Sequence, residues 1–238
     1  ALARVYAAVG EIGEGGRSDT DAPWPLHLLR AHTALLNARL AYAEQHGVGA
    51  ASHAQALHGT MAAVHLLAQR TSADGLAAER EVLGHCVRRA WALTSPVLCA
   101  AAPEGGAEDD DDNPLPELAH AMHIAQTDAL DTPAYQRILS YAWRTMKEAA
   151  ALHATVMRAS PDTQQGSDLF LEWMLHIRHR GAFSTIYPQY EGVAKDLLRT
   201  SDSPTAWLQQ LLARLDEQCE QFSTTRRSAG VGYAVLAL

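Results

Sequence analysis

Residues 132–157 read TPAYQRILSYAWRTMKEAAALHATVM, and this stretch decides the fold class. Proline is favoured at the first position of a helix, where its missing N–H costs no hydrogen bond, so Pro133 predicts a helix start. Apolar side chains then recur at a spacing that places them on one helical face. They are Leu139, Met146, Ala149 and Val156. The stretch therefore predicts a long amphipathic helix that packs against other helices.

Helical patterns of the same kind flank this stretch on both sides. Alanine and leucine dominate the composition, aromatic residues are few, and long β-branched alternations are absent. Further helices are expected over residues 23–44, 52–67, 76–93, 167–181, 190–198 and from 203 onward, with a short one over 117–131. About eight helices joined by short loops favour an all-α, HEAT/armadillo-like α-solenoid of antiparallel helix pairs. A compact helical bundle is the alternative.

Capping residues, glycines and prolines predict several helix boundaries. The expected starts are Ser52 with Gln55 as a capping box, Ser167 as a cap, and Ser203-Pro204. The expected ends are Gly47 with Gly49, Ser95-Pro96, and Gly181. A helix that ends at Gly181 carries Arg178 and Arg180 in its last turn, where the helix dipole favours cations. The favourable interaction with the helix dipole then explains why Arg178 and Arg180 lie together. The alternative is that they form a basic contact surface.

Acidic residues are concentrated in one segment. The net charge is −8, and six of the acidic side chains lie between Glu104 and Asp112, so the rest of the chain carries −2. Global acidity is therefore evidence neither for nor against a nucleic-acid partner. Residues 100–116 are expected to be a disordered acidic linker. It separates N-terminal helical repeats at 1–99 from further repeats at 117–238, which are expected to continue beyond this fragment of a longer chain.

Several functional classes find little support in the sequence. It contains no nucleophile elbow, H-E-x-x-H motif, strand-linked glycine fingerprint or placed pair of carboxylates, so neither an enzyme nor a cofactor is expected. His53, His58 and His65 are not spaced as metal ligands on one helix. The cysteines fit buried thiols in a reducing compartment. No apolar run approaches the roughly 20 residues of a membrane span, so a soluble protein is expected.

Near the carboxyl end the sequence runs STTRRSAGVGY over residues 223–233 and then turns apolar. Hydroxyl side chains ahead of an apolar run predict a helix start. Two arginines in the first turn oppose the helix dipole, at a cost of about 0.3–1 kcal/mol each. Arg226 and Arg227 are therefore expected to meet an anion, because helix amino ends bind phosphates and carboxylates. The alternative is that they pair with acidic neighbours in the fold or point into water.

The segment Arg226-Arg227-Ser228-Ala229-Gly230, followed by the aromatic Tyr233, resembles the signature of a large α-helical repeat family. This family contains the animal thyroid-adenoma-associated protein and the fungal auxiliary subunit of a tRNA 2′-O-ribose methyltransferase. Further segments match in the same order: SPVL at 95–98 with PEG at 103–105, WRTMKE at 143–148, and HIRHRGAF at 176–183. Gly232 departs from the family pattern, which usually carries proline at that position.

The resemblance implies a non-catalytic, HEAT-like auxiliary subunit in the cytoplasm that holds a tRNA. A separate 2′-O-methyltransferase would modify the anticodon loop and supply the catalytic residues. The residues expected to contact RNA phosphate or partner carboxylate are Arg226, Arg227, Ser228, Gly230, Arg178, Arg180, Arg144 and Lys147. The alternative is a protein–protein interaction scaffold in a larger regulatory assembly, without RNA contact. Arg144 would then form an internal ion pair with Glu148, four residues on.

Overall fold

The computed structural model describes residues 24–99, 133–160, 164–199, 201–217 and 229–238, and these residues form eight α-helices and no strand. The helices are α2 (Trp24–Ala54), α3 (Leu57–Ala68), α4 (Ala73–Leu98), α6 (Pro133–Arg158), α7 (Gln164–His176), α8 (Arg180–Leu197), α9 (Ser203–Glu217) and α10 (Ala229–Ala237). The all-α class is confirmed. The division into repeats around an acidic linker at 100–116 stays a prediction, because that segment lies outside the described residues.

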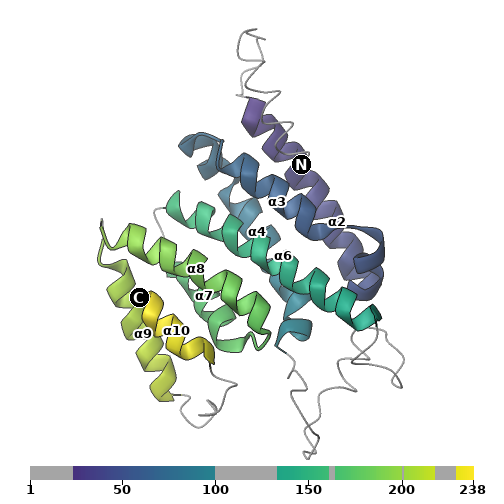
Figure 1. Cartoon of the computed structure of the whole chain (residues 1–238). Helices are drawn as coiled ribbons and strands as arrows, with labels where there is room; N and C mark the ends of the chain where they lie inside the picture. The colour runs from purple at the N-terminus through teal and green to yellow at the C-terminus, as the bar shows by residue number, and fades with distance from the viewer. Residues whose placement is uncertain (1–23, 100–132, 161–163, 200, 218–228) are drawn as a thin grey trace, which may run out of the picture.

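The helices follow one another across the molecule roughly in chain order (Figure 1). Helix α6 is central: it packs against α3 and α4 on one side and against α8 on the other. Helix α2 packs on α3 and α4, and α10 packs on α7 and α8. This sequential packing fits a helical repeat protein, whereas the continuous stacking of a solenoid stays a prediction.

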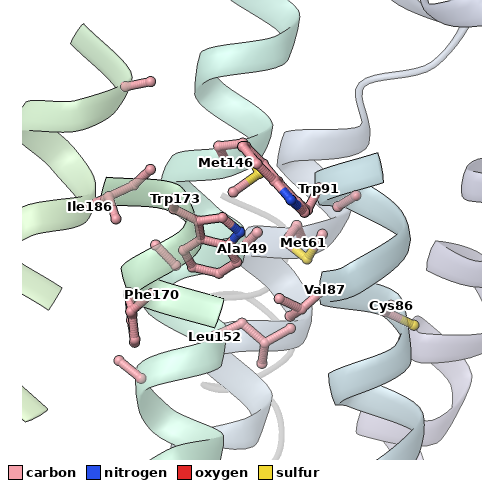
Figure 2. Close-up of a cluster of buried hydrophobic side chains, with 14 of the residues drawn as sticks. Met61, Cys86, Val87, Trp91, Met146, Ala149, Leu152, Phe170, Trp173 and Ile186 are labelled. Atoms are coloured by element: carbon pink, nitrogen blue, oxygen red, sulfur yellow. The ribbon is translucent and has the colours of Figure 1, made fainter. Parts of the chain in front are cut away.

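Helix α6 begins at Pro133 as predicted, and its apolar face forms the middle of the core. Met146 and Ala149 are fully buried, Val156 is buried, and Leu139 is partly buried against the core. Figure 2 shows side chains of α6 meeting side chains of α3, α4 and α7 in this region. These partners include Met61, Val87, Trp91, Phe170 and Trp173. The core therefore joins helices from both sides of the segment 100–132.

The break in α2 lies at Gly47, where a stop was predicted. Gly47 has a φ of 83° and a ψ of 158°, a conformation that is open essentially to glycine alone. The chain then resumes a helical path up to Ala54. Ser52 lies within this second part and donates its hydroxyl to the carbonyl oxygen of Gly49 at 2.7 Å. The predicted capping box of Ser52 is therefore wrong, and α3 begins without a side-chain cap.

Two prolines lie inside helices rather than at their boundaries. Helix α4 continues through Pro96 to Leu98, and α8 runs through Pro188 from Arg180. A proline removes one intrahelical hydrogen bond, but burial of the following side chains holds the helix together. Val97 is 3% exposed and Leu98 is fully buried. The predictions that one helix ends at Ser95-Pro96 and another begins at Tyr190 are wrong, because tertiary packing outweighs the local signal.

The boundary between α7 and α8 also differs from the prediction. Helix α7 ends at His176, and Gly181 lies in the first turn of α8 instead of ending α7. The cap of α8 is His179, whose Nδ1 accepts from the backbone N–H of Ala182 at 3.0 Å. Ser167 does not cap α7, because its buried hydroxyl forms a hydrogen bond with the Tyr190 hydroxyl at 3.0 Å.

Candidate functional site

The segments 95–98 and 176–183, which are far apart in sequence, meet at the carboxyl end of α4. The carbonyl oxygen of Leu98 accepts from the backbone N–H groups of Arg178 and His179, at 2.9 and 3.2 Å. The last carbonyls of a helix lack partners within it, so these amides satisfy a group that burial would otherwise leave unpaired. The three-residue link between α7 and α8 is thereby attached to the end of α4.

Helix α10 brings a third segment, 229–233, to the same place. The ring of Tyr233 packs edge to face against Phe183, with centroids 4.9 Å apart, and against Tyr187, with centroids 5.2 Å apart. Such pairs contribute about 0.5–1.5 kcal/mol beyond the area they bury. We call the assembly of segments 95–98, 176–183 and 229–233 the signature junction.

Arg178 belongs to the link in the signature junction, and its side chain is exposed. Burial raises the pKa of the Cys99 thiol to about 11, while the positive charge of Arg178 opposes this rise. The backbone hydrogen bond from Arg178 to Leu98 places this residue at the carboxyl end of α4, where a helix dipole favours cations. The prediction that Arg178 and Arg180 compensate the dipole of α7 is wrong, because α7 ends at His176 and Arg180 begins α8.

The segment 143–148 lies in the middle of α6. Thr145 and Met146 are fully buried, whereas Arg144 and Lys147 are exposed. The guanidinium carbon of Arg144 lies 5.7 Å from the ring centroid of Trp143, which is a cation–π distance. The ion pair found at Glu148 joins it to Lys147, at 3.6 Å, instead of the predicted Arg144.

Arg144 lies at the level of the signature junction along the helix axes. Helices α6 and α8 run side by side in the same direction (Figure 1), and Arg158 Nε forms an ion pair with Asp196 Oδ2 at 2.7 Å. Arg144 precedes Arg158 by 14 residues, or about 21 Å of helix, which brings it level with Ala182 on α8. Arg144 and the neighbouring Lys147 are thus level with the start of α8, whereas Arg158 lies at its carboxyl end.

The structure places only some of the predicted contact residues. Arg226, Arg227 and Ser228 lie outside the described residues, and Gly230 lies in the first turn of α10. Tyr187 is a partner of Tyr233 that was not predicted from the sequence. The signal for it is the spacing of Phe183 and Tyr187, four residues apart and therefore on one helical face.

The described ranges show no group of three or more His, Cys, Asp or Glu side chains that could hold a metal ion. None of the helices in these ranges is both long and apolar enough to cross a membrane. Cys86 and Cys99 are free thiols, and burial raises the pKa of Cys86 to about 11 as well.

Fold and junction together define the class: an all-α protein in which segments 95–98, 176–183 and 229–233, which come from separate helices, meet at one junction. Residues 80–238 match the family model described as THADA/TRM732, DUF2428. The chain belongs to this family.

The chain is also similar to individual family members. It is 31% identical over 163 residues to the "tRNA (32-2'-O)-methyltransferase regulator trm732" of Schizosaccharomyces pombe, covering 62% of this chain and 10% of that protein. It is 29% identical to the "tRNA (32-2'-O)-methyltransferase regulator THADA" of Gallus gallus over 149 residues, covering 52% of this chain and 8% of the relative. For the Homo sapiens THADA the identity is 29% over 125 residues, covering 43% of this chain and 6% of the relative. The chain thus spans a tenth or less of each of these relatives. No solved structure matches the chain significantly.

Proposed function

We propose that this chain is a non-catalytic segment of a cytoplasmic regulator that supports 2′-O-ribose methylation in the anticodon loop of tRNA by a separate methyltransferase. The observation that carries the proposal is the match of residues 80–238 to a family whose named members are methyltransferase regulators. The methyl donor and the catalytic groups belong, in this proposal, to the partner enzyme. The free thiols Cys86 and Cys99 fit the reducing conditions of the cytoplasm.

The proposed contact surface is the signature junction together with the arginines that precede α10. Arg178 is exposed there, and Arg144 and Lys147 are exposed on α6 at the same level. Folded RNA is recognised largely through its shape and its phosphates, which a few well-placed basic side chains can contact. The contacts are assigned to Arg226, Arg227, Ser228, Gly230, Arg178, Arg180, Arg144 and Lys147, with Gly230 allowing close backbone approach.

The test is tRNA binding by the 238-residue chain over a series of salt concentrations. Replacing Arg226 and Arg227 by alanine should weaken binding and lower the slope of log K against log salt by up to about 0.7 per phosphate contact removed. Arg199→Ala is the matched control, because Arg199 is exposed and follows the carboxyl end of α8, away from its junction end. Equal affinity and slope in the double variant and the control would exclude the RNA contact.

A protein–protein scaffold without RNA contact is the second candidate. It is favoured by apolar side chains exposed on the last helices: Leu212 is 51% exposed, Val235 39% and Leu236 72%. If the scaffold is correct, the arginine double variant loses affinity for the methyltransferase, and any residual tRNA binding is the same as that of the unmodified chain. The affinities of the arginine double variant and of Arg199→Ala for tRNA and for the methyltransferase therefore distinguish the two candidate functions.

A further inference from the structure

Basic side chains gather on helices α3 and α6, although the chain as a whole is acidic. The sequences of these two helices contain four Lys or Arg residues and one acidic residue, Glu148, so together they carry +3, whereas the whole chain carries −8. Helix α7, in contrast, contains two acidic residues and no Lys or Arg. A positive surface on an otherwise negative chain is the electrostatic footprint expected for a polyanion site.

The arginines of α6 lie on one face of the helix. Arg137 and Arg144 are seven residues apart, and Arg158 follows Arg144 by fourteen, so about two and four full turns separate them. Arg158 is already neutralised, because its Nε forms an ion pair with Asp196 Oδ2 at 2.7 Å. The described residues give neither Arg137 nor Arg144 an ion pair of this kind. The first half of the row therefore carries the positive charge.

The start of α6 meets the corner between α2 and α3. Arg137 Nη1 lies 2.8 Å from Nδ1 of His53, in the last turn of α2, so the guanidinium donates to the imidazole. Burial lowers the pKa of His58 in the first turn of α3, and the positive charge of Arg144 lowers it further, against the opposing charge of Glu148. A guanidinium has five N–H donors, so Arg137 keeps donors for an anion besides the one used on His53.

The cations extend along the surface as a row. Arg137 and Arg144 are about 10.5 Å apart along α6, and Lys147 is about 4.5 Å further on. Lys147 is 53% exposed, and its 3.6 Å contact with Glu148 is weak for that reason. We call His53, Arg137, Arg144 and Lys147 the α6 basic row. It runs from the α2–α3 corner to the level at which α8 begins, so a linear polyanion can reach both of its ends and a single small anion cannot.

We infer that the α6 basic row carries the RNA backbone from the signature junction to the α2–α3 corner, with Arg137 on a phosphate and His53 orienting its guanidinium. The inference rests on the proposed function, because both assign RNA as the ligand, and it adds Arg137 and His53 to the contact surface. A nucleic acid brings one negative charge with every nucleotide, which suits cations spaced along a helix. Phosphate contacts carry no sequence information, so Arg137 contributes affinity and orientation.

The test compares two substitutions on the same face of α6 that change the net charge equally. Arg137→Gln removes the proposed phosphate contact, and Arg158→Gln removes an arginine that is already paired with Asp196. Binding of an unmodified tRNA transcript to the 238-residue chain is measured between about 50 and 200 mM KCl. Arg137→Gln should weaken binding about three- to tenfold and lower the slope of log K against log salt by up to about 0.7, whereas Arg158→Gln should change neither.

Two further measurements identify the kind of contact. Arg137→Gln should weaken the binding of polyuridylate by the same factor as that of tRNA, because a phosphate contact does not depend on base sequence. His53→Ala should weaken tRNA binding only while Arg137 is present, so the double variant should bind as Arg137→Gln does. A loss that is additive in the double variant would overturn the orienting role of His53.

Equal tRNA affinities of the Arg137→Gln and Arg158→Gln proteins would overturn the inference. If the double variant of Arg226 and Arg227 still binds tRNA more weakly in that case, the proposed function stands without the α6 basic row. The reverse pattern would support the row and remove Arg226 and Arg227 from the RNA contact. Polyglutamate that binds more tightly than polyuridylate of equal charge would overturn the choice of RNA in favour of an acidic polypeptide.

Discussion

Acidification should destabilise the folded chain through His153. The ordinary pKa of histidine is 6.5, and burial among Phe170 and Trp173 lowers the pKa of His153 to about 4 in the folded chain. Between these two values the unfolded chain binds a proton that the folded chain excludes. The free energy of unfolding therefore falls as the pH drops from 6.5 towards 4, and this contribution is fully present only above 6.5.

The size of the effect follows from the two pKa values. One pKa unit corresponds to about 1.4 kcal/mol, so the complete loss is about 3.4 kcal/mol, of which about 2 kcal/mol is lost between pH 7 and pH 5. This is a large share of the roughly 5–15 kcal/mol that stabilises a typical domain. His58, His65 and His179 also have pKa values lowered mainly by burial, so they act in the same direction.

Urea unfolding at pH 7 and pH 5 isolates the contribution of His153 when it is compared with His153→Gln. The glutamine amide can keep the donation to the Gly166 carbonyl, but it does not titrate. The change in the free energy of unfolding between pH 7 and pH 5 should be about 2 kcal/mol smaller in the variant than in the unmodified chain. The contributions of the other histidines are the same in both proteins and cancel in this comparison. The same pH dependence in both proteins, or an NMR titration that gives His153 a pKa above 6, would contradict a buried neutral His153.

Three further predictions concern single positions. Gly47→Ala should destabilise the chain by about 1–3 kcal/mol in thermal unfolding, because of the φ of 83°, whereas Gly232→Ala should be neutral or slightly stabilising. Trp91→Phe should lower the free energy of unfolding by about 1.5–3 kcal/mol in urea, because it removes the hydrogen bond to the Glu172 carboxylate. Cys86, with its pKa of about 11, should resist maleimide at pH 7 until urea unfolds the chain, as mass spectrometry can show.

The fold class and the central helix could be predicted because their signals are local. Pro133 marks the start of α6, and the apolar spacing identifies Met146 and Ala149 as core residues. Boundaries set by tertiary packing could not be predicted in this way. Pro96 is a strong local stop signal, yet α4 continues because the buried Leu98 anchors its end against the α7–α8 link.

The signature junction could be predicted only as a set of segments. Nothing local indicates that the carbonyl of Leu98 accepts from Arg178, because this hydrogen bond joins residues 80 positions apart. The family resemblance singled out the segments, and the structure added the contact of Tyr233 with Phe183. His153 was missed altogether, because a single histidine among apolar residues gives no signal of an unsatisfied buried nitrogen.

The proposed role as a segment of a methyltransferase regulator is tested most directly by measuring 2′-O-methylation at position 32 of tRNA. A chimaera would carry this chain in place of the matching segment of Schizosaccharomyces pombe trm732 and would be assayed with the tRNA (32-2'-O)-methyltransferase. We predict that the chimaera supports methylation and that replacing Arg226 and Arg227 by alanine lowers the rate by about tenfold or more, the equivalent of about 1.4 kcal/mol. Equal methylation rates with and without the two arginines would contradict a role for Arg226 and Arg227 in tRNA binding.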